Sequence, residues 1–470
     1  MNEAAPLEQS IFDIRAPSLP AMNRARVFAL ALPIIGEQLL HTLVVAVDTL
    51  LVARINKEAV AGVGTAVEFI YFIIAILVAL EIGATVLISQ AFGAGDIARV
   101  VTLARQALSW AAALSIPVSI AGYVAAPHII GLFGLEPEVA DNATTYLQIT
   151  AATSVFLLLT FVCGAIFRGQ GDSRTPLLGA VFANVVNVIA SYLLIFGEFG
   201  LPELGVAGSA WGAALARATS AAIMLWLLFT GRRGITLAGS GSWIPHIESG
   251  RALFRLGLPA SIERILDSAG FVTMMAVVAM IGTSALAAQQ VVFTALAISF
   301  MPGFGFGLAA TSLVGQSVGA RDLESAAAAS RIAERWAIIW MAAGGIVYFA
   351  FAPSILRIFS EDPDVVEPGA RAVRALAVVL PLWAIWSVYG GSLRGLGDTI
   401  TPMISITVTV WSSVFVAYLL VRFFDGGLGS VWLTFACITP FGALFNRTRY
   451  WRKLGSASFR SKSGSEGAAF

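Results

Sequence analysis

The sequence predicts an all-α integral membrane protein built from two similar halves. Hydrophobic residues make up 58% of the 470 residues and charged residues only 12%, whereas a soluble domain carries about 25% charged residues. The apolar residues form long runs between short polar breaks, and a membrane-spanning helix needs about 20 such residues. The second half of the chain also repeats the first. Together these observations predict about twelve membrane-spanning helices, six in each half.

The repeat is clearest in two pairs of motifs. FRGQGDSRTP, which ends at Pro176, shares six residues with LRGLGDTITP, which ends at Pro402, 226 positions later. SQAFGAGD, ending at Asp96, matches GQSVGARD, ending at Asp322, at the same offset. No insertion or deletion separates these points, so the chain consists of two copies of one repeat unit.

Each run of apolar residues is assigned to one span. In the first half we expect spans near Val27–Ala53, Thr65–Ala91, Leu103–Ala126, Ala140–Phe167, Pro176–Phe196 and Val206–Thr230. In the second half we expect them near Leu253–Ile281, Val291–Val318, Ile332–Ala352, Ala370–Leu393, Pro402–Phe424 and Leu428–Phe445. They form an N-lobe (residues 27–230) and a C-lobe (residues 253–446). Because each lobe has an even number of spans, a pseudo-two-fold axis along the membrane normal should relate them.

Loop charges predict the orientation. Arg and Lys collect in every second connection, including the linker at residues 231–252, while several of the other connections are acidic. Basic loops lie on the cytoplasmic side. We therefore expect a plasma (inner) membrane protein with a cytoplasmic linker and cytoplasmic tails at residues 1–26 and 447–470. The polar ends, from residue 455 onward at the C-terminus, are expected to be disordered.

Several classes of function are disfavoured by the residues. The net charge of +1 does not indicate a nucleic-acid partner, and Cys163 and Cys437 lie inside apolar segments without metal or disulfide spacing. The sequence has no nucleophile elbow and no nucleotide-binding loop. We therefore expect a protein that is not an enzyme, has no cofactor and is a monomer in the lipid bilayer.

Ionisable residues inside the spans are the main functional candidates, because a charge in lipid is costly. Glu37, His41 and Asp48 lie on one face of the first span. Glu263 and Asp267 repeat the positions of Glu37 and His41 in the seventh span. For Glu37 and Glu263, a cavity-lining role and a structural pair with an arginine both remain open.

The fifth span has a polar face of its own. Asn184, Asn187 and Ser191 are aligned there and can donate hydrogen bonds to a carboxylate on a facing helix. The alternative is that they hold helices together, which is favoured for Asn184. Arg217 in the sixth span is a candidate partner for one of the acids.

Two further features have mainly structural interpretations. Glu68 and Glu81 lie on different sides of the second span, so at most one should face a cavity. In the repeated decapeptides, the arginine and the aspartate are expected to pair and fix the loop. Thr175 and Thr401 are expected to cap the helices that follow.

Together, VDTLLVARI around Asp48, GATVLISQAFGAGD, FRGQGDSRTP and LRGLGDTITP resemble the multidrug and toxic compound extrusion (MATE) family of secondary transporters. The resemblance covers about residues 27–445. It implies two six-helix bundles around a central cleft, and export of organic cations in exchange for H⁺ or Na⁺.

The resemblance also implies roles for individual residues. The cation-binding aspartate of the family's first helix matches Asp48, and its fifth-helix asparagine matches Asn187. The aspartate of the DNA-damage-inducible (DinF-type) branch falls on Ser191, the NorM-like seventh-helix glutamate falls on Asp267, and the NorM-like tenth-helix aspartate falls near Trp383. The chain resembles the DinF-type branch more closely.

The prediction is therefore a secondary active multidrug efflux transporter that exchanges small cationic or amphipathic compounds for H⁺ or Na⁺ by alternating access. The coupling site is expected at Asp48, Asn187, Ser191 and His41, and the substrate cavity at Glu37, Asn184, Glu263 and Asp267. The carboxylate of Asp48 or of Asp267 is a candidate ligand for a sodium ion. The alternatives are a flippase for lipid-linked precursors and a non-coupled channel or receptor.

Overall fold

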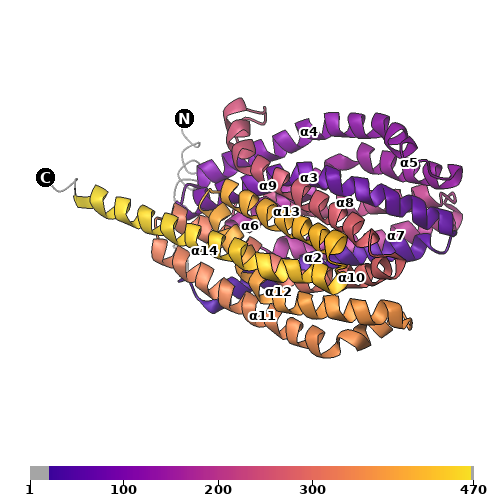
Figure 1. Cartoon of the computed structure of the whole chain (residues 1–470). Coiled ribbons are helices and arrows are strands. Elements are labelled where there is room, and N and C mark those ends of the chain that lie inside the picture. Colours follow the sequence, from indigo (N-terminus) through magenta and orange to yellow (C-terminus); the bar gives the residue numbers. More distant parts are fainter. Residues whose placement is uncertain (1–20, 467–470) are drawn as a thin grey trace.

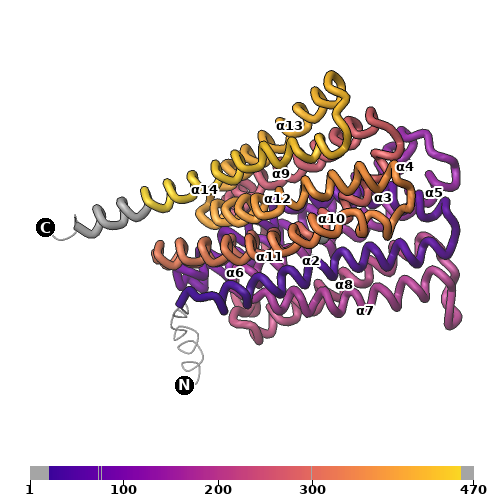
Figure 2. The backbone as a smooth tube through the Cα atoms, turned by 60° about the horizontal axis from the view of Figure 1, so that its bottom comes forward, coloured from indigo at the N-terminus to yellow at the C-terminus, as the bar shows by residue number. Residues whose placement is uncertain are grey.

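The computed structural model describes the backbone of residues 21–466, and their side chains except at positions 72, 76, 298 and 457–466. Residues 1–20 of the predicted N-terminal tail lie outside this range. The described chain is almost entirely helical, with long helices that run side by side (Figure 1). Its first helix starts, and its last helix ends, at the same end of the molecule (Figure 2).

The twelve expected spans all fall in described helices. Those of the N-lobe are α2 (Arg24–Val52), α3 (Lys57–Gly93), α4 (Ile97–Gly131), α5 (Pro137–Ala152), α6 (Ser154–Gln170), α7 (Arg174–Phe196) and α8 (Val206–Thr230), with a short 3₁₀ turn η1 (Glu198–Gly200). Those of the C-lobe are α9 (Ile247–Ala279), α10 (Thr283–Gly319), α11 (Leu323–Arg357), α12 (Pro363–Gly395), α13 (Ile400–Phe423) and α14 (Leu428–Glu466).

Two spans depart from the simple expectation. The fourth is divided at Thr153 into α5 and α6, which are bent by 53°. Ten of the described helices are long and apolar enough to cross a membrane, or eleven if this bent pair is one span. The seventh expected span is α9, whose middle carries Glu263, Arg264 and Asp267 and is therefore more polar than the others.

The C-terminal region is more ordered than predicted. Helix α14 continues to Glu466, so the expectation of disorder from residue 455 is wrong for the described part. The helix projects from the body of the molecule (Figure 1). Its first polar turns pack on the C-lobe, where the buried Tyr450 donates to the carbonyl oxygen of Ala326 at 3.0 Å. The polar composition at these positions belongs to a helix that continues past its apolar part.

The linker between the lobes is held against α4. The buried Arg105 donates to the carbonyl oxygens of Leu237 (3.0 Å) and Ser240 (2.9 Å). The side-chain oxygen of Gln106 accepts from the backbone N–H of His246 at 2.7 Å. Helix α9 then begins at Ile247, inside the segment predicted as linker. These hydrogen bonds thus fix the linker to the N-lobe.

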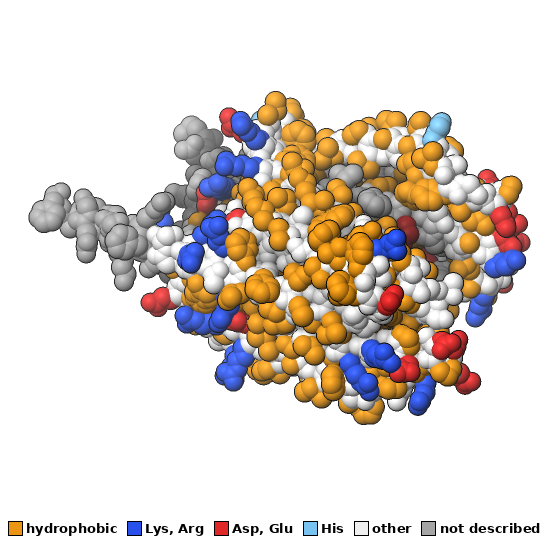
Figure 3. All heavy atoms as spheres, viewed as in Figure 1, with side chains coloured by type: hydrophobic (Ala, Val, Ile, Leu, Met, Phe, Trp, Pro, Cys, Tyr) orange, Lys and Arg blue, Asp and Glu red, His pale blue; other side chains and the backbone are white. Residues whose placement is uncertain are grey.

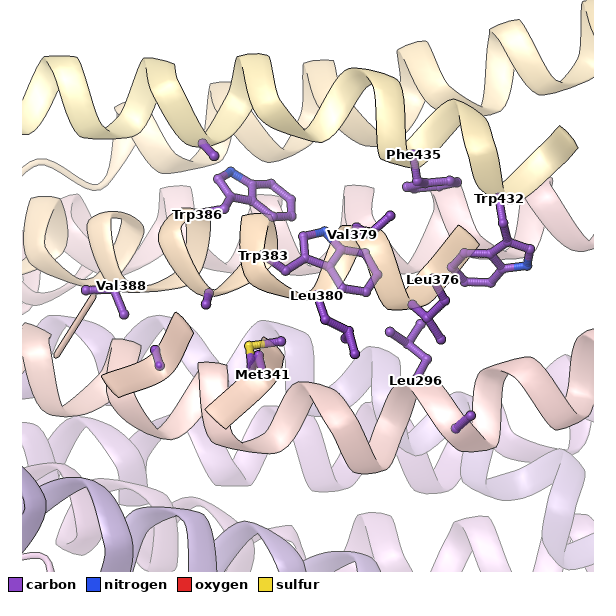
Figure 4. Packing of buried hydrophobic residues seen from close by; sticks show 14 of the residues in the cluster. Leu296, Met341, Leu376, Val379, Leu380, Trp383, Trp386, Val388, Trp432 and Phe435 are labelled. Carbon is purple, nitrogen blue, oxygen red and sulfur yellow. The ribbon is translucent and has the colours of Figure 1, made fainter. Parts of the chain in front are cut away.

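The largest apolar core lies mainly in the C-lobe and includes the start of α2, while the N-lobe has two further cores. In the C-lobe, Trp383, Trp386, Trp432 and Phe435 pack with aliphatic residues of α10, α11 and α12 (Figure 4). In the face shown in Figure 3, apolar side chains dominate the middle and most charged side chains lie toward the two ends. This distribution is typical of helices that cross a bilayer.

The lobes contact each other through the repeated motifs. The side-chain amide of Gln90 on α3 donates to the carbonyl oxygen of Gly395 at 3.0 Å. The side-chain amide of Gln316 on α10 donates to the carbonyl oxygen of Gly169 at 2.9 Å. Gln90 and Gln316 are equivalent in the repeat, as are Gly169 and Gly395. The glutamine-containing motif of each half therefore binds the decapeptide of the other half, and the contact is reciprocal.

Glycines permit this close approach. A Cβ atom on Gly93 would overlap the backbone carbonyl of Gln316, and one on Gly319 would overlap the backbone carbonyl of Gln90. Gly93 and Gly319 are also equivalent in the repeat. The two helices α3 and α10 therefore cross almost in backbone contact, and this closes one end of the space between the lobes.

Candidate functional site

A polar cluster lies between α2 and α7 in the N-lobe. Asp48 of α2 accepts hydrogen bonds at 3.2 Å from the side-chain amide of Asn187 and at 3.2 Å from the hydroxyl of Ser191, both on α7. The Asn187 amide also lies 3.3 Å from the Ser191 hydroxyl. Asn187 and Ser191 are fully buried and Asp48 is 5% exposed. The hydrogen bonds predicted from the sequence are therefore present.

The surroundings of this cluster leave an acceptor available. Gly212 of α8 touches Ser191, so a side chain there would displace the serine hydroxyl. The buried side-chain oxygen of Asn187 has no hydrogen-bond partner among the described residues. Tyr146 and Arg217 are close enough to act electrostatically on Asp48. Arg217 is therefore a distant partner of Asp48, without an ion pair in the described part of the chain.

The cluster has the chemistry of a small-cation site. A carboxylate, an amide oxygen and a hydroxyl are ligands suited to hard cations. A proton on Asp48 fits equally, because the Asn187 oxygen can accept a hydrogen bond from a carboxylic acid. Within residues 21–466, no three His, Cys, Asp or Glu side chains are grouped to hold a metal ion. The fit therefore depends on the neutral oxygens as much as on Asp48.

His41 lies about two helical turns from Asp48 and next to Glu37. Its Nε2 is 3.9 Å from Glu37, and it is seven residues, or about 10 Å along the helix axis, from Asp48. The structure therefore places His41 beside Glu37 rather than beside Asp48, and its role in the coupling site stays a prediction. The position is explained by helix geometry, because residues four apart are neighbours on one face.

Glu37 belongs to a buried ion-pair network. Arg168, which is 2% exposed, donates to both carboxylate oxygens of Glu37 at 3.1 Å and to Glu81 at 2.7 Å. The structural alternative for Glu37 is therefore the one observed. Glu81 is enclosed in this network while Glu68 is exposed.

The arginine of the first decapeptide does not pair with the aspartate of the same motif. Asp172 instead accepts hydrogen bonds from the backbone N–H (3.1 Å) and hydroxyl (2.6 Å) of Thr175. The predicted Arg168–Asp172 pair and the predicted capping by Thr175 are both wrong. The aspartate fixes the start of α7, because the first N–H groups of a helix lack partners within the helix.

The C-lobe repeats this arrangement. Arg394 donates to Glu263 at 2.5 Å, and Asp398 accepts from the backbone (3.1 Å) and hydroxyl (2.6 Å) of Thr401. Glu263 is therefore also a structural partner of an arginine.

The two remaining predicted residues lie apart from these networks. Asn184 donates to the carbonyl oxygen of Ala180 in its own helix at 2.8 Å, so this hydrogen bond does not join two helices. Asp267 has no hydrogen bond or ion pair to the described residues and lies within electrostatic reach of Arg264. Trp383, which stands near the position of the NorM-like acid, is 3% exposed in the C-lobe core.

Sequence reasoning missed Tyr146, Arg264 and the role of Arg168. The signal for Arg168 was its recurrence as Arg394, because a charge that is repeated in both halves requires a repeated partner. Arg264 was detectable as a charge in the middle of a span.

Comparisons with known proteins agree with the repeat. A family model described as MatE matches the chain twice, over residues 33–193 and over residues 259–419. Positions 33 and 259 are 226 residues apart, and so are 193 and 419, which is the offset of the sequence repeat. The probable multidrug resistance protein NorM of Thermotoga maritima is 31% identical over 412 residues, which cover 87% of this chain and 88% of that protein. The uncharacterized transporter YisQ of Bacillus subtilis is 24% identical over 432 residues, with 91% and 94% covered.

Solved structures share the fold. A MOP superfamily transporter from Pyrococcus furiosus, with a binding pocket of reversed polarity, has a TM-score of 0.86 at 22% identity and covers 93% of this chain and 96% of its own. A multidrug resistance MATE family transporter in an outward-facing conformation has a TM-score of 0.85 at 22% identity, with the same coverage. The two-lobed helical architecture predicted from the sequence is therefore confirmed.

Proposed function

The chain belongs to the MATE family of multidrug efflux transporters, and from this premise we propose what it carries and what drives it. The protein exports small cationic or amphipathic organic compounds in exchange for H⁺ or Na⁺ by alternating access of its two lobes. The observation that carries this proposal is the buried carboxyl group of Asp48 between Asn187 and Ser191.

Asp48 suits the coupling role because it is an acid in an apolar span. Burial in low-dielectric surroundings makes a charged carboxylate costly unless it is neutralised. A proton or a sodium ion neutralises it, and so does a cationic substrate nearby. Coupling requires that ion and substrate favour different arrangements of the lobes. A carboxylate that is neutralised by either the ion or the substrate, but not by both at once, supplies this difference in affinity between the two arrangements.

The reciprocal contact of Gln90 and Gln316 supports alternating access. It closes the space between the lobes at the end that carries the arginine-rich motifs. The charge distribution of the loops favours a cytoplasmic location for this end. The similarity to an outward-facing transporter supports the same interpretation. We place the protein in the plasma (inner) membrane as a monomer, with both described chain ends cytoplasmic.

The deciding experiment measures substrate efflux from proteoliposomes driven by an imposed pH gradient or, separately, by a Na⁺ gradient. Asp48→Asn should insert normally and lose gradient-driven efflux, while Asn187→Ala should weaken it less. Asp425→Asn, in the loop after α13, is a matched removal of a carboxylate and should behave as the wild type. If Asp48→Asn keeps wild-type efflux under both gradients, Asp48 is not the coupling residue and the site must be sought near Asp267.

A further inference from the structure

Six exposed basic side chains of α11 and α14 lie at the end of the C-lobe from which α14 projects, and we call them the basic patch (Figure 3). Arg447 of α14 pairs with Glu334 of α11 at 3.3 Å. Lys453 of α14 pairs with Asp398 at 2.6 Å. The other four have no ion pair among the described residues, and they are Arg331 and Arg335 of α11 and Arg449 and Arg452 of α14.

The two helices form one surface at this patch. The guanidinium of Arg331 on α11 lies over the ring of Trp451 on α14, 4.9 Å from its centroid. The buried Tyr450, next to Trp451, donates to the carbonyl oxygen of Ala326 on α11. The basic residues of α11 and α14 are therefore held side by side.

On each helix, an exposed stripe changes from apolar to basic along its length. On α11, the exposed Ile339 shares a face with Arg335 and Arg331, at intervals of four residues. On α14, the exposed Phe445 precedes Arg449 by four residues, and the Arg449 guanidinium lies 5.4 Å from the Phe445 ring centroid. Exposed apolar side chains of a spanning helix face the lipid tails, and basic side chains at its end reach the headgroups.

The N-lobe lacks this open surface. Arg105 of α4 is the repeat equivalent of Arg331, but it is buried and its guanidinium binds carbonyl oxygens of the linker. Ser109 stands at the position equivalent to Arg335. In the C-lobe the chain continues outward in α14, and both arginines of α11 stay exposed in the described structure. The repeat thus shows that an exposed arginine pair is not needed to build a lobe.

We propose that the basic patch binds the headgroup of an anionic phospholipid. Arg331 and Arg335 contact the phosphate, because a guanidinium donates two parallel hydrogen bonds to phosphate oxygens. The acyl chains lie along the exposed apolar stripes of α11 and α14, and Trp451 lies at the headgroup level as an interfacial aromatic residue. The remaining arginines of α14 add to the attraction of the anionic headgroup.

A lipid fits this surface better than an acidic soluble protein does. The basic residues continue directly into the apolar stripes that face the lipid tails, so a ligand with a charged head and apolar chains covers both parts. The inference goes beyond the proposed export function, and the proposed orientation is needed only to place the headgroup in the cytoplasmic leaflet. The site belongs to the C-lobe alone, so lipid should bind without a gradient and without substrate.

The test measures binding of single lipid molecules to the purified full-length protein in detergent by native mass spectrometry. The probes are dioleoyl phosphatidylglycerol, which is anionic, and dioleoyl phosphatidylcholine, which has the same acyl chains and no net charge. The wild type should bind phosphatidylglycerol more tightly. Arg331→Gln/Arg335→Gln should weaken this binding by about thirtyfold, as expected for two basic residues beside an anionic headgroup. Arg331→Lys/Arg335→Lys keeps the charge and should retain most of the affinity.

A matched control removes the same charge elsewhere. Arg357→Gln/Arg422→Gln changes two exposed arginines at the opposite end of the C-lobe, and phosphatidylglycerol should bind it as it binds the wild type. Arg331→Gln/Arg335→Gln should unfold close to the wild-type temperature in lipid-free detergent, because neither arginine has an ion pair among the described residues. A loss of lipid binding is then separated from a loss of folding.

Three results would overturn the lipid site. They are equal affinity of the wild type for the two lipids, unchanged phosphatidylglycerol binding by Arg331→Gln/Arg335→Gln, and an equal loss in the control variant. If a short polyglutamate peptide binds the wild type in phosphatidylcholine nanodiscs, and Arg331→Gln/Arg335→Gln abolishes only this binding, the patch docks an acidic protein instead. Gradient-driven efflux is measured separately, so the export proposal can stand or fail independently.

Discussion

The two lobes differ most where the N-lobe gathers its polar residues. At the positions equivalent to Asp48 and Ser191, the C-lobe has the fully buried Met274 and Ala417. The acid and the serine of the N-lobe thus correspond to apolar residues in the C-lobe, whereas Asn187 corresponds to Ser413, which donates to the carbonyl oxygen of Thr409 in its own helix. Because the backbone pattern is shared, this polarity is not needed to build a lobe. The comparison therefore separates residues that make the fold from residues available for transport.

The features that both lobes share are structural. Each lobe has a glutamate bound to the arginine of its decapeptide, and each has an aspartate that fixes the next helix. Both lobes also supply one glutamine to the contact between them. Where a shared feature has gained or lost a partner in one lobe, the comparison makes quantitative predictions.

The largest difference in stability should come from the two arginines. Arg168 pairs with both Glu37 and Glu81, whereas Arg394 pairs with Glu263 and is more exposed. Removing one member of a buried ion pair costs about 3–5 kcal/mol, because the partner charge stays behind. Arg168→Met should therefore reduce thermal stability in detergent more than Arg394→Met. The double variant Arg168→Met/Glu81→Gln should recover part of the loss.

Thermal unfolding of the detergent-solubilised protein, followed by tryptophan fluorescence, measures these effects. Equal losses for Arg168→Met and Arg394→Met would show that Glu81 does not add to the N-lobe network. The comparison of the lobes would then have to be explained by exposure alone.

A smaller effect is expected at the glutamines between the lobes. Each hydrogen bond contributes about 0.5–1.5 kcal/mol. Gln316 also accepts a hydrogen bond from Arg26 at 2.8 Å, and the equivalent of Arg26 in the second half is Ala252. Gln316→Ala should therefore open this end of the lobes more often than Gln90→Ala.

Spin labels at the equivalent positions Ala98→Cys and Glu324→Cys, in a background without the exposed Cys437, report this opening as a longer distance. Gln148→Ala, in α5 away from the lobe contact, serves as the control. Identical distance distributions for Gln90→Ala, Gln316→Ala and the control would mean that the reciprocal hydrogen bonds do not hold the lobes together.

The sequence predicted the fold better than it predicted the hydrogen-bond and ion-pair partners of individual residues. Membership of the MATE family and the two-lobed fold are confirmed, because apolar runs and a constant offset are properties of the chain itself. The contact of Asp48 with Asn187 and Ser191 was also predictable from the polar face of the fifth span together with the family resemblance. The partners of Arg168 were not, since Glu37 and Glu81 come from two other helices whose packing no local pattern specifies. The DinF-type branch and the functional roles of the site residues stay predictions.

The smallest expected effect concerns the aspartates of the two decapeptides. Asp398 binds Lys453 of α14 at 2.6 Å, a contact that Asp172 lacks in the described residues. Burial raises the pKa of Asp398, but hydrogen bonds from Lys453 and Thr401 outweigh this effect and hold the pKa below its ordinary value. A carboxyl group with a lowered pKa in the folded state stabilises the protein above its unfolded pKa of about 3.9. That stability is lost as the pH falls through the lower, folded value.

Lys453→Met should remove part of this acid-sensitive stability. The lysine is about half exposed, so solvent screening limits the loss to less than about 1 kcal/mol. Thermal unfolding at neutral pH should therefore show a small decrease for Lys453→Met. The decrease should shrink as the pH falls below about 4 and through the lower pKa of folded Asp398, where the carboxyl group takes up a proton. Arg452→Met, the neighbouring basic residue, is the control. A loss that stays constant from neutral to acid pH would mean that Lys453 stabilises the C-lobe through packing of α14 rather than through the charge of Asp398.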